Sequence, residues 1–216
     1  MRTLATLGAA LALAAPLGAF AAGHQSHLDA YYIPRSDLKI EPDTVLPLDY
    51  DDDGDGYGVK GQFQVTPTFF IHGEYQAIDY NEDDDTGLLK DDLNTYRIGG
   101  GFFVDPDEPV FIKAEYIGVD LGDSDDGDEN IDEDYNGYGI HAGALGHVGD
   151  ALSLNASIGY INLDGTDGYE YLVGAGFQFT DMFGVFADYR GTHLELDDDN
   201  GDFEFADFRT GLRLVF

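Results

Sequence analysis

The 216-residue sequence contains no cysteine and no tryptophan, and it has only 10 basic residues against 43 acidic ones, for a formal net charge of −33. Without cysteine there is no disulfide framework, no thiolate zinc site and no cysteine nucleophile. So few basic residues argue against nucleic-acid binding, because the phosphates would be repelled. The 14 tyrosines and 15 phenylalanines argue against a disordered chain, since disordered chains are poor in aromatic residues. The length favours one domain.

Long apolar runs are also missing, apart from a short one at the N-terminus. Residues 1–21 combine a basic Arg2, a short apolar stretch and a small-x-small triplet ending at Ala21. This pattern predicts a secretory signal peptide, the alternative being an N-terminal helix of a cytosolic domain. No later run reaches the ~18 apolar residues of a transmembrane helix. We therefore expect an exported chain whose one domain spans residues 22–216.

Ten segments of that domain alternate apolar with other residues, as in Tyr57-x-Val59-x-Gly61-x-Phe63-x-Val65. A period of two predicts β-strands. Short connections, such as 66–68 and 180–181, alternate with long ones at 36–55, 80–94, 121–135, 162–168 and 195–204. This order predicts an all-β fold, an antiparallel up-and-down β-barrel of ten strands, with eight as the alternative count.

The apolar faces of these strands could line a soluble interior or face lipid around a polar lumen. Tyrosines gather at the long-connection ends of the strands and phenylalanines at the short-turn ends, as in the two aromatic girdles of membrane barrels. The nine residues of 57–65 would cover roughly 23 Å at ~3.3 Å per residue and ~40° tilt, close to the ~25 Å apolar band of such barrels. The sequence therefore favours a transmembrane barrel with a polar lumen.

The last strand ends on an aromatic residue in the pattern Arg209-x-Gly211-x-x-Leu214-x-Phe216. This pattern resembles the terminal assembly signal of Gram-negative outer-membrane barrels. The segment 55–61 and the ending at Phe216 make the whole mature chain similar to the small outer-membrane β-barrel family. Within it, the likeness is to ten-strand members with acidic loops, some of which are named as secreted quorum-type factors.

The resemblance implies localisation in the cell outer membrane. Its implied partners are outer-membrane lipid, lipopolysaccharide, periplasmic chaperones and the barrel-assembly machinery, which reads the last strand. Nucleic acid is not among the expected partners, and we expect a monomer. For a membrane-embedded barrel, a structural or surface-interaction role fits better than that of a diffusible signal.

The opposite phase of the strands places charged residues in the predicted lumen. Seven are bases and six are acids, so a nearly neutral lumen is expected inside a strongly acidic chain; the bases are Arg35, Lys60, Arg97, Lys113, Arg190, Arg209 and Arg213, and the acids are Asp29, Glu74, Glu115, Glu170, Asp188 and Asp207. We predict that paired charges and amides such as Gln76 fill this lumen, because burying them unpaired would be costly. The alternatives are a small porin for cations or small solutes and a soluble periplasmic barrel that binds an apolar ligand.

Ten strands is also the size of the outer-membrane proteases, which need Asp–His and Asp–Asp pairs. His193 lies near Asp197 and Asp198 in the sequence, His72 and His141 fall in the lumen phase, and Ser124 and Ser153 are isolated. No nucleophile, base and orienting group come together in the sequence. We therefore expect no enzyme and no cofactor.

Of the 43 acidic residues, 32 fall in the five long connections or at their strand edges. Two stretches match the first half of a calcium-binding loop, namely Asp51, Asp53 and Asp55, followed by Gly56, and Asp132, Asp134 and Asn136, followed by Gly137. Neither has the closing glutamate, so neither is an EF-hand. The simpler interpretation is a solvated acidic rim. The alternative is that Ca²⁺ or Mg²⁺ binds these loops and bridges them to anionic lipopolysaccharide.

Overall fold

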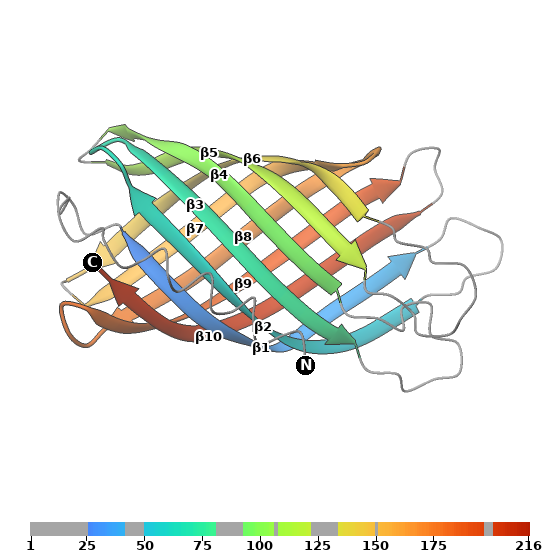
Figure 1. Ribbon diagram of the computed structural model, residues 1–216, viewed down its shortest axis with the longest axis horizontal. Helices are drawn as coiled ribbons and strands as arrows, with labels where there is room; N and C mark the ends of the chain where they lie inside the picture. Colours follow the sequence, from blue (N-terminus) through green and yellow to red (C-terminus); the bar gives the residue numbers. More distant parts are fainter. Residues whose placement is uncertain are drawn as a thin grey trace.

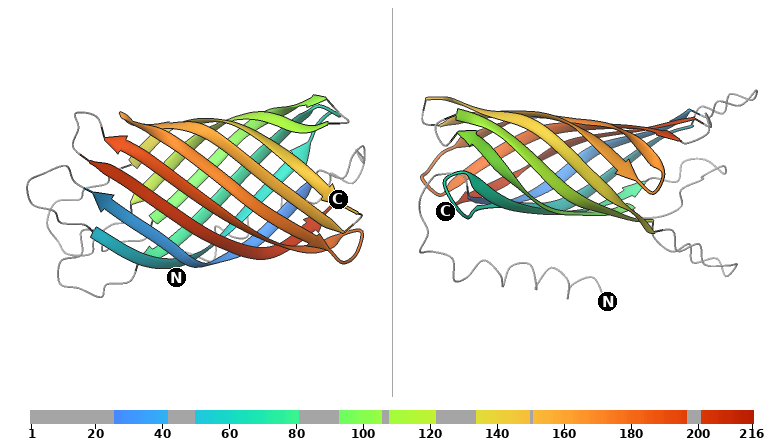
Figure 2. Two further views of the ribbon diagram at one scale, coloured as in Figure 1. Left: turned by 180° about the vertical axis from the view of Figure 1, so that it is seen from behind. Right: turned by 90° about the horizontal axis from the view of Figure 1, so that it is seen from above.

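The computed structural model describes residues 26–41, 50–80, 93–105, 108–121, 134–149, 151–196 and 201–216, which form a closed antiparallel barrel (Figures 1 and 2). Each strand pairs with its neighbour in sequence, and β1 pairs with β10 to close the ring. The strands are β1 (His27–Glu41), β2 (Tyr50–Gln64), β3 (Phe69–Tyr80), β4 (Leu93–Asp105), β5 (Glu108–Leu121), β6 (Asp134–Val148), β7 (Leu152–Leu163), β8 (Thr166–Gln178), β9 (Phe183–Leu196) and β10 (Asp202–Val215). The predicted ten-strand, up-and-down order is confirmed. In this part of the chain no helix is long and apolar enough to cross a membrane.

The two ends of the barrel differ in their connections. Short turns such as 65–68 and 179–182 lie at one end, where the C-terminus also lies (Figure 1). The connections 42–49, 81–92 and 122–133, which are outside the described residues, belong to the opposite end. We call these ends the turn end and the loop end.

The strands reach further toward the loop end than predicted. β1 continues to Glu41 and β2 begins at Tyr50, so much of the expected connection 36–55 is strand. The expected long connection 162–168 is wrong, because Leu163 pairs with Thr166. Only Asp164 and Gly165 join β7 to β8, with φ values of 40° and 91°. Positive φ at both central residues is the geometry of a tight hairpin turn, for which Asp-Gly is a preferred sequence.

A bulge in β1 changes which residues face the interior. The pairing of β1 shifts register between Tyr32 and Arg35 toward β10, and between Ile33 and Ser36 toward β2. Pro34 lies inside this bulge, where its missing N–H costs no ladder hydrogen bond. Alternation therefore restarts in the opposite phase.

The expected position of Arg35 in the lumen is wrong for this reason. Its side chain is 67% exposed on the outer surface and donates to the Asp37 carboxylate at 2.7 Å. Ser36 and Leu38 occupy the interior instead, both fully buried.

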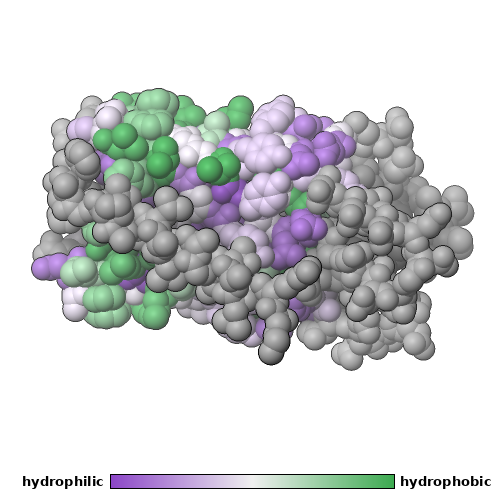
Figure 3. Space-filling model, viewed as in Figure 1, coloured by the Kyte–Doolittle hydropathy of each residue, from purple (hydrophilic) through white to green (hydrophobic). Residues whose placement is uncertain are grey.

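The apolar face of the sheet changes sides partway along the strands. On the turn side of β5, Ile112 is exposed and Glu115 is buried. On the loop side of Tyr116, Ile117 is buried inside and Asp120 is exposed. β3 and β9 repeat the change. Figure 3 shows hydrophobic side chains gathered near the turn end and hydrophilic ones toward the loop end. We call the exposed apolar surface near the turn end the apolar belt.

A ring of aromatic residues marks the level at which the polarity changes. Their hydroxyl groups reach toward the loop end, since Tyr32 donates to Asp55 at 3.0 Å and Tyr75 donates to Asn94 at 2.8 Å. This is the geometry of an aromatic girdle at a membrane–water interface. The tyrosine ring contains one exposed residue from each strand in order, Tyr32, Tyr57, Tyr75, Tyr96, Tyr116, Tyr138, Tyr160, Tyr171, Tyr189 and Phe208.

Candidate functional site

Ion pairs fill the interior on the turn side of the tyrosine ring. Arg209 of β10 donates through Nε to Asp188 Oδ1 at 2.5 Å and through NH1 to Glu74 Oε1 at 2.7 Å. The other oxygen of Glu74 accepts from Arg190 at 2.6 Å. Lys60 of β2 donates to Asp188 Oδ2 at 2.5 Å. Four strands, β2, β3, β9 and β10, thus meet through charged side chains.

A second group of ion pairs joins β4, β5 and β8. The Arg97 guanidinium donates to both oxygens of Glu170, at 2.8 and 2.7 Å, and to Glu115 Oε1 at 3.0 Å. Lys113 donates to the other oxygen of Glu115 at 2.9 Å. Arg190 Nε lies 3.8 Å from Glu170 Oε2 and links this group to the first. We call the two groups together the ion-pair network.

The structure places all ten of the residues proposed for the lumen network inside the barrel. Arg213, the tenth of them, forms a bidentate ion pair with Asp29, at 2.8 and 2.7 Å. With Arg35 outside, the interior bases are Lys60, Arg97, Lys113, Arg190, Arg209 and Arg213, and the interior acids are Asp29, Glu74, Glu115, Glu170, Asp188 and Asp207. Among the described residues the lumen charges therefore balance, with histidine counted as neutral.

Multiple pairing explains how so many charges can be buried. Arg209 has no exposed side-chain surface, and Glu115 is 1% exposed. Removing charges of this kind from water costs several kcal/mol each, and only close partners and additional hydrogen bonds offset that cost. Each of these groups has at least two partners of opposite charge. The network therefore stabilises the barrel only as a complete set.

Neutral side chains complete this interior. Tyr31 donates its hydroxyl to Glu74 at 2.7 Å. Ser36 and Gln76 donate to the two oxygens of Asp207, at 2.7 and 3.0 Å. Gln76 was expected in the lumen, whereas sequence reasoning missed Tyr31 and Ser36. Tyr31 was detectable, because it stands in the same phase as Asp29. Ser36 was not, since the bulge changes the phase before it.

An apolar layer lies on the loop side of the ion-pair network. Its central side chains are at most 7% exposed and come from β1, β3, β4, β5, β7 and β9, namely Ile33, Leu38, Ile78, Leu93, Ile117, Ile161 and Leu194. Phe203 and Phe205 of β10 pack against it. We call this cluster the apolar layer. It lies between the ion-pair network and the loop end.

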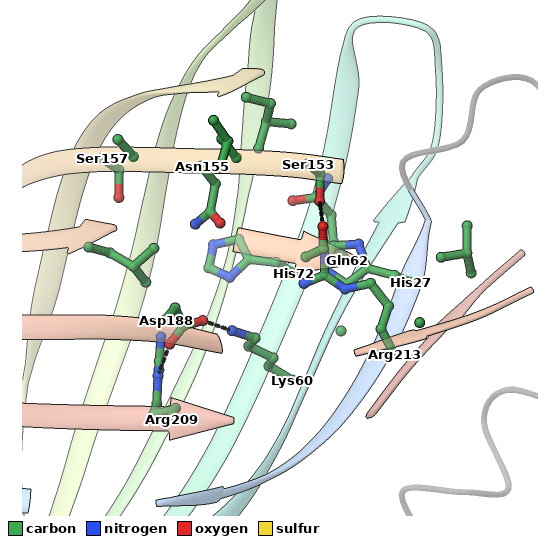
Figure 4. A pocket seen from close by; sticks show the side chains of 18 of the residues that line it. His27, Lys60, Gln62, His72, Ser153, Asn155, Ser157, Asp188, Arg209 and Arg213 are labelled. Carbon is green, nitrogen blue, oxygen red and sulfur yellow. Dashed lines mark hydrogen bonds and ion pairs between the residues drawn. The ribbon is translucent and has the colours of Figure 1, made fainter. Parts of the chain in front are cut away.

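A cavity of about 220 Å³ lies between the ion-pair network and the turn end. Lys60, Asp188 and Arg209 stand together at its inner side (Figure 4). Further lining side chains that Figure 4 labels are His27, Gln62, His72, Ser153, Asn155, Ser157 and Arg213. The lining also includes His147, near the end of β6. The His147 side chain is exposed, so the cavity reaches solvent at the turn end.

One set of buried ligand-type side chains lies within the network. Ligand atoms of Glu115, His141 and Glu170 are all within 4.8 Å of one another. Arg97 already donates to both carboxylates, and Lys113 donates to Glu115. The side chains of Arg97 and Lys113 thus already neutralise the carboxylates that a metal ion would need as ligands. The arrangement is that of an ion-pair site rather than of a metal centre.

The first acidic half-motif lies on a strand. Asp51, Asp53 and Asp55 belong to β2, and Asp53 and Asp55 are exposed on its outer face. Alternate residues of a strand are about 6.6 Å apart, so the carboxylates of Asp53 and Asp55 stand in a row on the outer face rather than converging as in a calcium loop. Asp53 lies 3.6 Å from the Arg35 guanidinium.

The second half-motif is only partly described. Asp132 lies outside the described residues, while Asp134 begins β6 and Asn136 follows on the same strand. Asn136 Oδ1 accepts hydrogen bonds from Tyr96 at 3.3 Å and from Tyr116. The Asn136 side-chain amide therefore accepts hydrogen bonds from two members of the tyrosine ring.

The histidines and serines considered for catalysis are separated. His72 and His141 point to Glu115, at 3.4 and 2.9 Å, and Ser153 donates to the Gly176 carbonyl at 3.4 Å. His193 is on the outer face beside Glu204, at 3.2 Å. Asp197, Asp198 and Ser124 lie outside the described residues. These three histidines therefore lie beside carboxylates.

The four residues of the C-terminal pattern lie on the strand that closes the barrel. Arg209 belongs to the ion-pair network. A Cβ at Gly211 would lie 2.2 Å from the Ala30 carbonyl oxygen, so close contact between β10 and β1 requires glycine there. Leu214 pairs with Leu28, and Phe216 donates its N–H to the Ser26 carbonyl at 3.1 Å. Close packing of β10 on β1 thus accounts for Gly211, and the ion-pair network accounts for Arg209.

No family model matches the sequence, and no curated protein matches it. Solved structures with a similar fold include an outer-membrane channel from Pseudomonas putida F1, 13% identical over 93% of this chain and 98% of that one, with a TM-score of 0.48. The outer-membrane protease OmpT from Escherichia coli is 11% identical over 88% and 96%, with a TM-score of 0.49. The translocator domain of the autotransporter NalP from Neisseria meningitidis is 11% identical over 99% and 96%, also at 0.49. At these identities the likeness concerns the barrel fold and not the function. By its own geometry, the chain is a closed ten-strand antiparallel β-barrel with an apolar belt outside and balanced charges inside.

Proposed function

We propose that the chain is an integral outer-membrane β-barrel with a structural or surface-interaction role and an interior closed to solutes. The observation that carries this proposal is the change of polarity at the tyrosine ring. On the turn side, apolar residues such as Ile98 and Leu212 are 65% and 66% exposed while charges are buried. On the loop side, the outer surface is acidic and the interior is apolar. A barrel that passes from lipid into water at the tyrosine ring would have an apolar outer surface on the turn side and an acidic one on the loop side.

The dimensions support the same placement. The belt segment from Tyr57 to Val65 has nine residues, which suits the ~25 Å apolar band of an outer membrane. β2 has 15 residues, enough for roughly 38 Å at ~3.3 Å per residue and ~40° tilt. The strands therefore extend past the membrane on the loop side, and the tyrosine ring marks the outer interface.

The interior favours this proposal over both alternatives. A soluble barrel that binds an apolar ligand needs an apolar cavity, whereas the cavity here is lined by side chains such as Lys60, Asp188 and Arg209. A porin needs a continuous water path, whereas the ion-pair network and the apolar layer lie one above the other across this lumen. Charges neutralised within the lumen also leave little field to select ions.

Reconstitution tests the proposal with two readouts. Protein refolded into lipid vesicles is expected to stay with the vesicles after an alkaline wash and to show heat-dependent gel mobility. The same protein in planar bilayers is expected to give no stable conductance on the nanosiemens scale, with a general porin as positive control. Loss from the vesicles would refute membrane insertion. Vesicle retention with stable conductance would refute only the closed interior.

We also propose that the acidic loop-side surface interacts with divalent cations and, through them, with lipopolysaccharide. The support is a set of exposed carboxylates just beyond the tyrosine ring, on six strands, at Asp53, Asp55, Asp79, Asp120, Asp167, Glu195 and Glu204. Carboxylates at this density repel one another and the anionic sugars unless cations such as Ca²⁺ or Mg²⁺ bridge them.

Calcium is therefore expected to raise the melting temperature at millimolar concentration relative to chelator. The double variant D53N/D55N is expected to lose part of this shift. The variant D181N, which removes an exposed carboxylate at the turn end, should retain it all. Equal melting temperatures in calcium and chelator would contradict cation binding.

A further inference from the structure

The cavity at the turn end exposes mainly the basic half of a neutral ion-pair network. The side chains of Lys60, Lys113 and Arg213 are 16%, 19% and 23% exposed. Their partners Asp29 and Glu115 are 0% and 1% exposed. Five bases line the cavity but only two acids do, since Asp29 and Glu115 lie outside the lining; the bases are Lys60, Lys113, Arg190, Arg209 and Arg213, and the acids are Glu74 and Asp188.

The same lining supplies further groups that suit a negatively charged guest. An ammonium has three N–H donors, and Lys113 donates one of them to Glu115 in the described structure, so further N–H groups can turn to the cavity. Ser157 and Asn155 of β7 stand across the cavity from Lys60 (Figure 4). Charged donors hold oxyanions through short, strong hydrogen bonds.

Apolar side chains complete the wall. Phe111, Leu145 and Leu172 line the cavity from β5, β6 and β8. A volume of about 220 Å³ limits the guest to a small molecule. Small-molecule sites commonly combine such an apolar wall with a few convergent polar groups.

We propose that this cavity binds a small organic carboxylate from the turn-end side. The carboxylate lies against Lys113, Lys60 and Arg213, and its carbon skeleton lies against Phe111 and Leu172. Binding goes beyond the proposed structural role, and it needs no open path through the barrel, because the innermost lining residues, such as Arg190 and Arg209, belong to the ion-pair network. Entry and release occur at the turn end.

Benzoate, and benzyl alcohol as its uncharged match, are suitable probes for protein refolded in uncharged detergent at low salt. Methyl NMR of leucine-labelled protein follows Leu145 and Leu172 during each titration. Benzoate is expected to shift both methyl signals saturably. Benzyl alcohol is expected to bind about tenfold more weakly or worse, since it lacks the charge.

Two variants locate the charge. Lys113→Gln is expected to weaken benzoate binding about tenfold, because a charge-assisted hydrogen bond is lost while Glu115 keeps Arg97. Arg35→Gln removes the same charge from the outer surface and should leave binding unchanged. If Lys113→Gln fails to fold, Lys60→Gln replaces it.

Equal binding of benzyl alcohol, or benzoate binding without movement of the two leucine signals, would overturn the proposal. These readouts use detergent-refolded protein, so they do not depend on whether the barrel conducts or where it resides.

Discussion

Replacing Ile112 with arginine is expected to lower the free energy of unfolding in lipid by about 2–4 kcal/mol, the cost of a basic side chain near the bilayer midplane. Ile112 is 53% exposed on the apolar belt. It lies about midway between Glu108, where β5 begins at the turn end, and Tyr116 of the tyrosine ring. Urea titration of protein folded in lipid vesicles measures the change. In water this substitution on an exposed position would cost little.

The matched control is Asp120→Lys, on the same strand and the same face but beyond the tyrosine ring. Asp120 is exposed and stands opposite Asp134 in the register of β5 and β6. A basic residue there is expected to change the free energy of unfolding by less than about 1 kcal/mol. If Ile112→Arg were as mild as this control, the apolar belt would not face lipid and the proposed membrane insertion would fail.

Replacing Arg97 with methionine is expected to cost about 3–5 kcal/mol, because it leaves buried charges without their main partner. Glu170 loses two hydrogen bonds and keeps Thr192, at 3.1 Å, and the more distant Arg190 and His141, at 3.8 and 4.0 Å. Glu115 loses one hydrogen bond but keeps Lys113. Urea titration in lipid or detergent gives the change.

A second substitution distinguishes this electrostatic cost from simple loss of packing. In the double variant Arg97→Met/Glu170→Gln the uncompensated carboxylate is gone, so recovery of at least about 1 kcal/mol over the single variant is expected. Arg35→Met, at the exposed outer arginine, should cost less than about 1 kcal/mol. A double variant no more stable than Arg97→Met alone would show that the pairing of charges does not account for the loss.

Alternation was enough to predict the number and order of the strands. Apolar residues two apart, as at Tyr57, Val59 and Phe63, reflect a rule of the backbone, since successive side chains point to opposite sides of a strand. The same rule assigned all ten proposed network residues to one face. Neither inference needed knowledge of distant contacts.

The strand ends and the position of Arg35 were not predicted correctly. Aspartate is depleted in strands, so the acidic stretch from Asp51 to Asp55 indicated a loop. In the structure it belongs to β2, where Asp53 and Asp55 are exposed and Gly54 between them faces inward beside Tyr80 and Ile78. Two signals were readable: Asp164-Gly165 is a preferred hairpin turn, and Pro34 marks a bulge.

The period, the strand order and the side of the sheet on which most residues lie follow from the amino-acid sequence, because they depend on the local geometry of an extended chain. The partners of the buried charges depend instead on contacts between distant strands. Arg97 pairs with Glu170, 73 residues away, and Arg213 with Asp29, 184 residues away. Closure of the ten strands brings such partners together across the lumen or the closing seam. The apolar layer and the cavity with its exposed bases follow from that closure, since it alone sets which side chains share one level of the barrel.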